Sequence, residues 1–131
     1  GPHYEHMGHP ETSGTFPRLI CKYVREEKTL RLIEAIKKIT VYPAERFGIK
    51  RKGSIREGYD ADLVIFDDTR IEDRADYVGK GNPNEPPGGI DYVIVNGSIV
   101  AKKGIITQNR NAGKMIENLE GFSEQGKNET E

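Results

Sequence analysis

The sequence predicts an α+β fold in which helices come first and strands follow. Two observations lead to this prediction. Between residues 14 and 48 apolar side chains recur at helical spacing, and from residue 63 onward short runs of β-branched and aromatic residues are separated by turn residues. The length of 131 residues suits one domain. Because only 34% of the residues are hydrophobic and 31% are charged, we expect a thin core that depends on additional packing.

The stretch from Gly58 to Asp67 is the centre of the predicted sheet. Leu63 to Phe66 form an unbroken run of strand-prone apolar residues, a pattern that favours a strand buried on both faces. Three aspartates flank this run: Asp60, Asp62 and Asp67. They could ligate a hard cation, but turn and capping hydrogen bonds to the backbone are the favoured role, since aspartate commonly makes them where strands begin and end.

Three helices are expected before this strand. Each is indicated by apolar residues on one face and by a start or stop residue. The expected helices are Thr15 to Glu27 with Pro17 in its first turn, a second helix that begins at Thr29 and carries Leu32, Ile33, Ile36 and Ile39, and Ala44 to Phe47, which Gly48 ends.

After the strand, residues 68–89 form a long loop rich in proline and glycine. Such a length is unusual in a compact domain, so the loop is functional, folded against something absent, or mobile. Asn96-Gly97 lies between the strand-prone runs Tyr92 to Val95 and Ser98 to Ala101. This dipeptide predicts a β-hairpin with a type I′ turn.

The two ends of the chain are expected to lack regular structure. Residues 1–13 are predicted as a loop, and the opening Gly1-Pro2 could be a protease scar from the expression vector. Histidines recur there at every third position, but a tetrahedral metal site needs a fourth ligand, so adventitious loop histidines are favoured over a metal site. Residues 120–131 are polar and are predicted to be disordered. Residues 14–48 form the helical part, and residues 49–119 form the β part.

Composition excludes several functions. A formal net charge of −1 offers no electrostatic case for binding nucleic acid or an anionic membrane. The apolar runs are too short for a transmembrane helix, and no signal peptide is visible. The single cysteine, Cys21, rules out an intrachain disulfide and fits a cytoplasmic protein. No phosphate-binding glycine loop, His-Glu-x-x-His motif or glycine-flanked serine is present.

Several short motifs occur in a characteristic order: Thr40, Pro43-Ala44, Phe47-Gly48-Ile49, Gly53-Ser54-Ile55, Gly58, Ala61 to Asp67, and Val93 to Gly97. Together they resemble the C-terminal signature of metal-dependent amidohydrolases. Three further stretches, Gly14 to Arg18, Lys22 to Glu27 and Asp73-Arg74-Ala75, are similar to the N-acyl-D-amino-acid deacylase (D-aminoacylase) branch of that superfamily.

This resemblance implies a C-terminal fragment of a larger enzyme. The family's metal is held by a (β/α)₈ barrel, which needs about 250 residues and cannot fit here. We therefore expect helices from the end of the barrel followed by strands of a β-sandwich. The parent enzyme is expected to hydrolyse the amide bond of N-acyl-D-amino acids with zinc or another divalent metal. This chain is expected to hold no metal ligand or catalytic residue and to be inactive alone.

The resemblance also implies which residues lie near the substrate in the full enzyme. The segment after the last barrel strand borders the active site of such enzymes, so the expected residues are His9, Glu11, Thr15, Phe16 and Arg18. The deacylase pattern usually reads His-Pro-Arg where this sequence has His9-Pro10-Glu11. A glutamate repels a substrate carboxylate, whereas an arginine would bind it.

The expected partners are the rest of the parent enzyme, namely the barrel and the N-terminal sandwich strands, and a small-molecule substrate. Exposed strand edges could also allow copies of the fragment to associate. Two alternatives remain open at this point. One is a standalone, non-catalytic binding or assembly module derived from the sandwich domain, and the other is part of a hydantoinase- or dihydroorotase-like enzyme.

Overall fold

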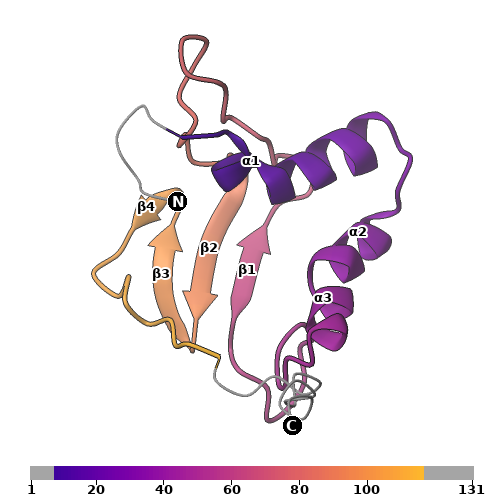
Figure 1. The fold of residues 1–131 in the computed structure, drawn as a ribbon, viewed down its shortest axis with the longest axis vertical. Helices are drawn as coiled ribbons and strands as arrows, with labels where there is room; N and C mark the ends of the chain where they lie inside the picture. Colours follow the sequence, from indigo (N-terminus) through magenta and orange to yellow (C-terminus); the bar gives the residue numbers. More distant parts are fainter. Residues whose placement is uncertain (1–7, 117–131) are drawn as a thin grey trace, which may run out of the picture.

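The computed structural model describes residues 8–116 and has the expected α+β composition, with helices followed by strands (Figure 1). His3, His6 and the 120–131 tail lie outside the described residues. Within them no helix has the length and apolar character needed to cross a bilayer. The elements are α1 (Glu11–Arg18), the π-helical segment η1 (Leu19–Glu26), α2 (Leu32–Ile39), α3 (Val41–Arg46), β1 (Leu63–Phe66), β2 (Ile90–Val95), β3 (Ser98–Lys102) and β4 (Ile105–Ile106).

The first helix begins at Glu11, so the prediction of a loop as far as Ser13 is wrong for its last three residues. The backbone N–H of Glu11 donates to Nδ1 of His9 at 3.2 Å, which satisfies one of the free donors of the first helical turn. Pro17 consequently lies inside the helix and not in its first turn. A proline there removes a backbone hydrogen bond and crowds the preceding turn, and the chain winds more widely directly after it, as η1.

Thr29 ends the first helix and does not begin the second. Lys28 has a φ of +54° and turns the chain back, and the N–H and Oγ1 of Thr29 donate to the Tyr23 carbonyl at 2.9 and 3.2 Å. Arg31 caps α2, because its N–H donates to the Glu34 carboxylate at 3.3 Å. The sequence pattern missed this arrangement because arginine is not a typical capping residue.

The third helix begins at Val41, three residues before the predicted start at Ala44. Pro43 does not prevent this, because it lies in the first turn, where its missing N–H needs no partner. Gly48 ends the helix as predicted. Its φ is +63°, and the N–H of Ile49 donates to the Ala44 carbonyl at 2.8 Å.

The four strands form an antiparallel sheet in the order β1-β2-β3-β4. The predicted strand at residues 63–66 is present, but it is an edge strand. Val64 and Ile65 are 53% and 50% exposed, so the prediction of burial on both faces is wrong for the described chain. Asn96 and Gly97 connect β2 to β3 with φ angles of +47° and +78°, the conformation that a type I′ turn requires.

The core lies in the helical part and not in the sheet. The apolar residues that are buried among those described belong to helices or to the β1–β2 connection, and none belongs to a strand. They are Ile20, Cys21, Ala35, Ala44 and Ile71. In Figure 1, α2 and α3 lie beside β1, and α1 lies at one end of the sheet. None of the described strand residues is buried, so the described residues cover the faces of the sheet incompletely.

The long segment 68–89 has ordered backbone pairing. Glu72 and Gly88 exchange two backbone hydrogen bonds of 3.2 and 3.1 Å. Gly89 has a φ of +74°, and a Cβ there would lie 2.4 Å from the backbone nitrogen of Ile71. Only glycine permits this approach. The segment therefore folds back on itself and buries Ile71 and Pro83.

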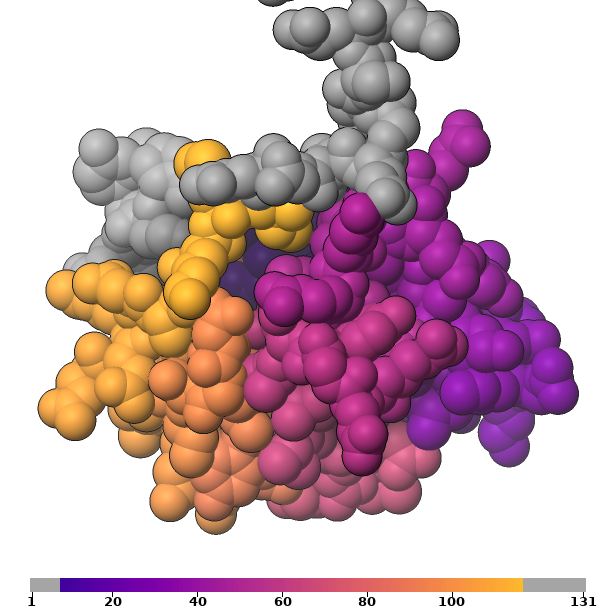
Figure 2. Space-filling model, turned by 90° about the horizontal axis from the view of Figure 1, so that it is seen from below, coloured from indigo at the N-terminus to yellow at the C-terminus, as the bar shows by residue number. Residues whose placement is uncertain are grey.

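Ion pairs within the connector before β1, and one hydrogen bond from the connector, link it to the hairpin turn. Lys52 contacts the carboxylates of Asp60, at 3.2 Å, and of Asp62. Asp62 also accepts the backbone N–H of Asn96 at 2.8 Å. Asp62 thus makes a backbone hydrogen bond at the turn, as expected, whereas Asp60 forms ion pairs with Arg51 and Lys52. From below, the magenta connector lies between the violet helices and the orange strands (Figure 2).

Acid is expected to weaken this connection. The hydrogen bond from Lys52 holds the pKa of Asp62 below its ordinary value of 3.8. The folded state therefore binds fewer protons than the unfolded state, so the contribution to stability is complete above the ordinary pKa and is lost as pH falls through the lowered one. Asp62→Asn should flatten the acid limb of the free energy of unfolding, measured by urea titration at several pH values. The matched control is Asp68→Asn at an exposed aspartate, and an acid limb equally steep in both variants would contradict the assignment.

Candidate functional site

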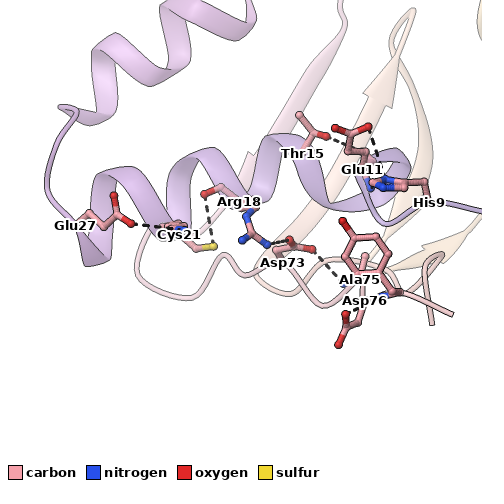
Figure 3. Close-up of polar contacts among 11 residues, drawn as sticks. His9, Glu11, Thr15, Arg18, Cys21, Glu27, Asp73, Ala75 and Asp76 are labelled. Carbon is pink, nitrogen blue, oxygen red and sulfur yellow. Dashed lines mark hydrogen bonds and ion pairs between the residues drawn. The ribbon is translucent and has the colours of Figure 1, made fainter. Parts of the chain in front are cut away.

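The five residues expected near the substrate border a single groove with a volume of about 480 Å³. One wall is the start of the first helix, and the other is the segment 73–77 of the β1–β2 connection (Figure 3). Four of the five belong to α1, so they are held by helical geometry and not by a loop. They are His9, Glu11, Thr15, Phe16 and Arg18.

The helical wall presents groups with different chemistry. The Glu11 carboxylate is 81% exposed and lies 3.6 Å from Nδ1 of His9. The Thr15 hydroxyl donates to the Glu11 carbonyl at 2.7 Å, so its hydrogen bond is used within the helix. Phe16 is 61% exposed and supplies apolar surface. Among these side chains, Glu11 and Phe16 are the most accessible to a ligand.

The opposite wall is anchored by Asp73. Its carboxylate accepts a hydrogen bond from Nη1 of Arg18 at 3.5 Å and from the backbone N–H of Ala75 at 3.1 Å. Four residues later, the Tyr77 ring meets the His9 ring edge to face, with centroids 5.1 Å apart. The sequence prediction did not include Asp73 or Tyr77 in the site. The Asp73-Arg74-Ala75 motif was the available signal, but sequence alone does not show that it packs on α1.

Arg25 of η1 binds a second part of the β1–β2 connection. Its Nη1 donates to the backbone carbonyl of Ile71 at 2.5 Å and to that of Asp68 at 3.3 Å. The guanidinium thereby satisfies carbonyls beside the buried Ile71 side chain. This contact and the one between Arg18 and Asp73 tie the β1–β2 connection to the helical segment that forms the other wall of the groove.

The groove is more acidic than basic. Glu11, Asp73 and Asp76 contribute carboxylates, and the cation of Arg18 is paired with Asp73. Leu19 and Ile39 add apolar lining. Such a surface suits a neutral or cationic ligand group with an apolar part better than it suits a carboxylate.

The described side chains do not form a metal centre. Across residues 8–116, no three histidine, cysteine, aspartate or glutamate side chains gather as ligands would. Asp67, for example, accepts hydrogen bonds from Thr69 and Arg70, which hold its pKa well below the usual range. The groove therefore offers binding groups but does not fit a metal.

Comparison with known proteins assigns the chain to a family. The profile of the amidohydrolase family matches residues 11–100. The chain belongs to the amidohydrolase family. The match begins at the first residue of α1 and ends within β3, so the groove, the connector and most of the sheet all lie inside the amidohydrolase region.

Within this family the chain is similar to deacylases and to a dihydroorotase. The D-aminoacylase of Alcaligenes xylosoxydans xylosoxydans is 37% identical over 115 residues, which are 88% of this chain and 23% of that protein. The dihydroorotase of Lactobacillus acidophilus is 33% identical over 97 residues, which are 68% of this chain and 23% of that protein. The chain thus spans about a fifth of the length of these amidohydrolases.

Solved structures agree with this. A D-aminoacylase crystal structure has a TM-score of 0.71 and 37% identity, covering 76% of this chain and 20% of that one. The N-acyl-D-glutamate deacylase of Bordetella bronchiseptica, in complex with zinc and a phosphonate inhibitor, has a TM-score of 0.66 and 37% identity, covering 70% of this chain and 19% of that one. The fold of this chain is therefore that of a part of these amidohydrolases.

Replacing Arg25 is expected to release the β1–β2 connection from the helices. Arg25→Ala removes a charged donor from two backbone carbonyls and should lower the free energy of unfolding by about 2 kcal/mol. Urea denaturation measures the loss, and limited proteolysis should show earlier cleavage within residues 68–89. Arg110→Ala, at an exposed arginine, is the control. Equal stability and equal cleavage in both variants would show that Arg25 does not anchor the connection.

Proposed function

We propose that the chain is the C-terminal part of a metal-dependent amidohydrolase that cleaves the amide bond of N-acyl-D-amino acids or related compounds. In this proposal the helices come from the end of a (β/α)₈ barrel, and the strands belong to a β-sandwich. A divalent metal, zinc or another, is held by residues outside those described and supplies the activated water. The observation that carries the proposal is the 37% identity to a D-aminoacylase over 88% of this chain.

The uncovered sheet supports the proposal that the rest of the enzyme packs against this part. Val64 and Ile65 of β1 are half exposed, and Ile99 of β3 is 40% exposed. Apolar surface of this extent on an open strand edge is typical of an interface. We assign the strand edge and the sheet faces to the remaining sandwich strands and the barrel. A second copy of the chain could compete for them when they are uncovered.

In the proposed enzyme the groove between α1 and residues 73–77 borders the substrate. His9, Glu11, Thr15, Phe16 and Arg18 line it from the helix side. Glu11 stands where the deacylase pattern has an arginine, and Arg18 is paired with Asp73. Neither residue is therefore available as a free cation for a substrate carboxylate. We infer that the substrate group facing Glu11 is neutral or cationic.

The first test is hydrolysis by the full-length gene product. Metal-loaded protein should release amino acid from an N-acetyl-D-amino acid, chelation should abolish the release, and added zinc should restore it. The chain described here, assayed alone with zinc, should release none. Turnover of dihydroorotate or a hydantoin instead would favour the second candidate, which the similarity to dihydroorotase suggests. Metal-dependent turnover by the isolated chain would refute the proposal that residues outside those described hold the metal.

The second test concerns charge preference. Glu11→Arg in the full-length protein reverses one exposed charge at the groove, an interaction of about 1 kcal/mol per charge pair at close range in water. The ratio of kcat/KM for N-acetyl-D-glutamate to that for N-acetyl-D-leucine should rise by roughly tenfold. The control Glu45→Arg places the same change on an exposed residue of α3, away from the groove. An unchanged ratio of kcat/KM in the Glu11 variant would show that Glu11 does not contribute to substrate selection.

A further inference from the structure

The carboxylate of Asp73 rests directly on the backbone of α1. Its side chain is 10% exposed. A Cβ added to Gly14 would lie 2.2 Å from one carboxylate oxygen of Asp73 and 2.8 Å from the other. No residue larger than glycine fits there without displacing the carboxylate. Position 14 is a glycine inside a helix, where glycine costs about 1 kcal/mol relative to alanine, so the close approach accounts for its presence.

A carboxylate buried to this degree needs partners, because an isolated buried charge is strongly unfavourable. Arg18, one turn after Gly14 on α1, supplies the charge from the helix side at 3.5 Å. The backbone N–H of Ala75 supplies a second donor at 3.1 Å. These contacts fix Asp73 relative to both the helix and its own segment.

The segment that Asp73 starts carries the second wall of the groove. Asp76 and Tyr77 follow Asp73, and both line the groove. The Tyr77 ring meets the His9 ring at an interplanar angle of 89°. His9 in turn accepts the backbone N–H of Glu11 through Nδ1. A displacement of Asp73 would therefore reach His9 through Tyr77.

We infer that Asp73 is a positioning residue. The packing of its carboxylate on Gly14 holds residues 73–77 against α1, and this sets the distance between Tyr77 and His9 across the groove. Asp73 is not required to touch the ligand. The effect on catalysis rests on the proposed function, because it requires the groove to border the substrate. The effect on the geometry of the groove does not depend on the proposed function.

The kinetic test uses Asp73→Asn in the full-length gene product. Asparagine keeps the shape but loses the charge that pairs with Arg18. KM for the N-acetyl-D-amino acid should rise about fivefold, the effect of one lost hydrogen bond, while kcat stays within about twofold. Gly14→Ala should reproduce this change by displacing the carboxylate, and the double variant should be no worse than either single variant. Asp68→Asn in the same loop is the control.

A second measurement needs no enzymatic activity. The rate at which diethylpyrocarbonate modifies His9, followed by peptide mass spectrometry, should rise severalfold in Asp73→Asn and in Gly14→Ala but not in Asp68→Asn.

If the full-length protein shows no hydrolysis, the proposed function fails, and the His9 rate alone decides the role of Asp73. If Asp73→Asn does not fold, Arg18→Gln, which removes the exposed partner, is measured instead. An unchanged KM together with an unchanged His9 rate overturns the inference, as does a fall in kcat equal to the rise in KM.

Discussion

The arrangement of this chain depends on the attachment of the β1–β2 connection to the first helix. Arg25 donates to two backbone carbonyls of that connection, and Asp73 packs on Gly14 with Arg18 as its partner. These polar contacts, with the buried side chain of Ile71, attach the connection between two strands to the helices. Asp73, whose side chain is 10% exposed, can be held there because Arg18 and the backbone N–H of Ala75 are its partners.

The apolar residues of the sheet are incompletely covered in the described part of the chain. Its strands have apolar side chains on both faces, yet none of them is buried in the part of the chain that the structure describes. A hydrophobic sheet gains stability only when another layer covers it. The low apolar content of the sequence and the exposure of Val64 and Ile65 have the same explanation under the proposed function. Both are expected if this chain is about a fifth of an amidohydrolase whose other layers pack against the sheet.

The groove connects this packing to chemistry. Helical geometry displays Glu11 and Phe16 on one wall, and the anchored segment brings Tyr77 against His9 on the other. The groove offers shape and charge, and across residues 8–116 its histidine and carboxylates do not gather as a metal centre. Under the proposed function its contribution is recognition of the substrate. The departure from His-Pro-Arg at Glu11 then bears on which substrate is accepted, while the reaction type is set elsewhere.

The sequence by itself determined the local structure and the family. The run Leu63 to Phe66 forms a strand, and Gly48 ends a helix, because these depend on propensities and on positive φ within a few residues. The tertiary structure alone decided the rest. Among the described residues β1 is the edge of the sheet, with β2 as its one partner, and Asp73 reaches Gly14 across 59 positions of sequence. Contacts between distant residues leave no periodicity, so local patterns could not reveal them.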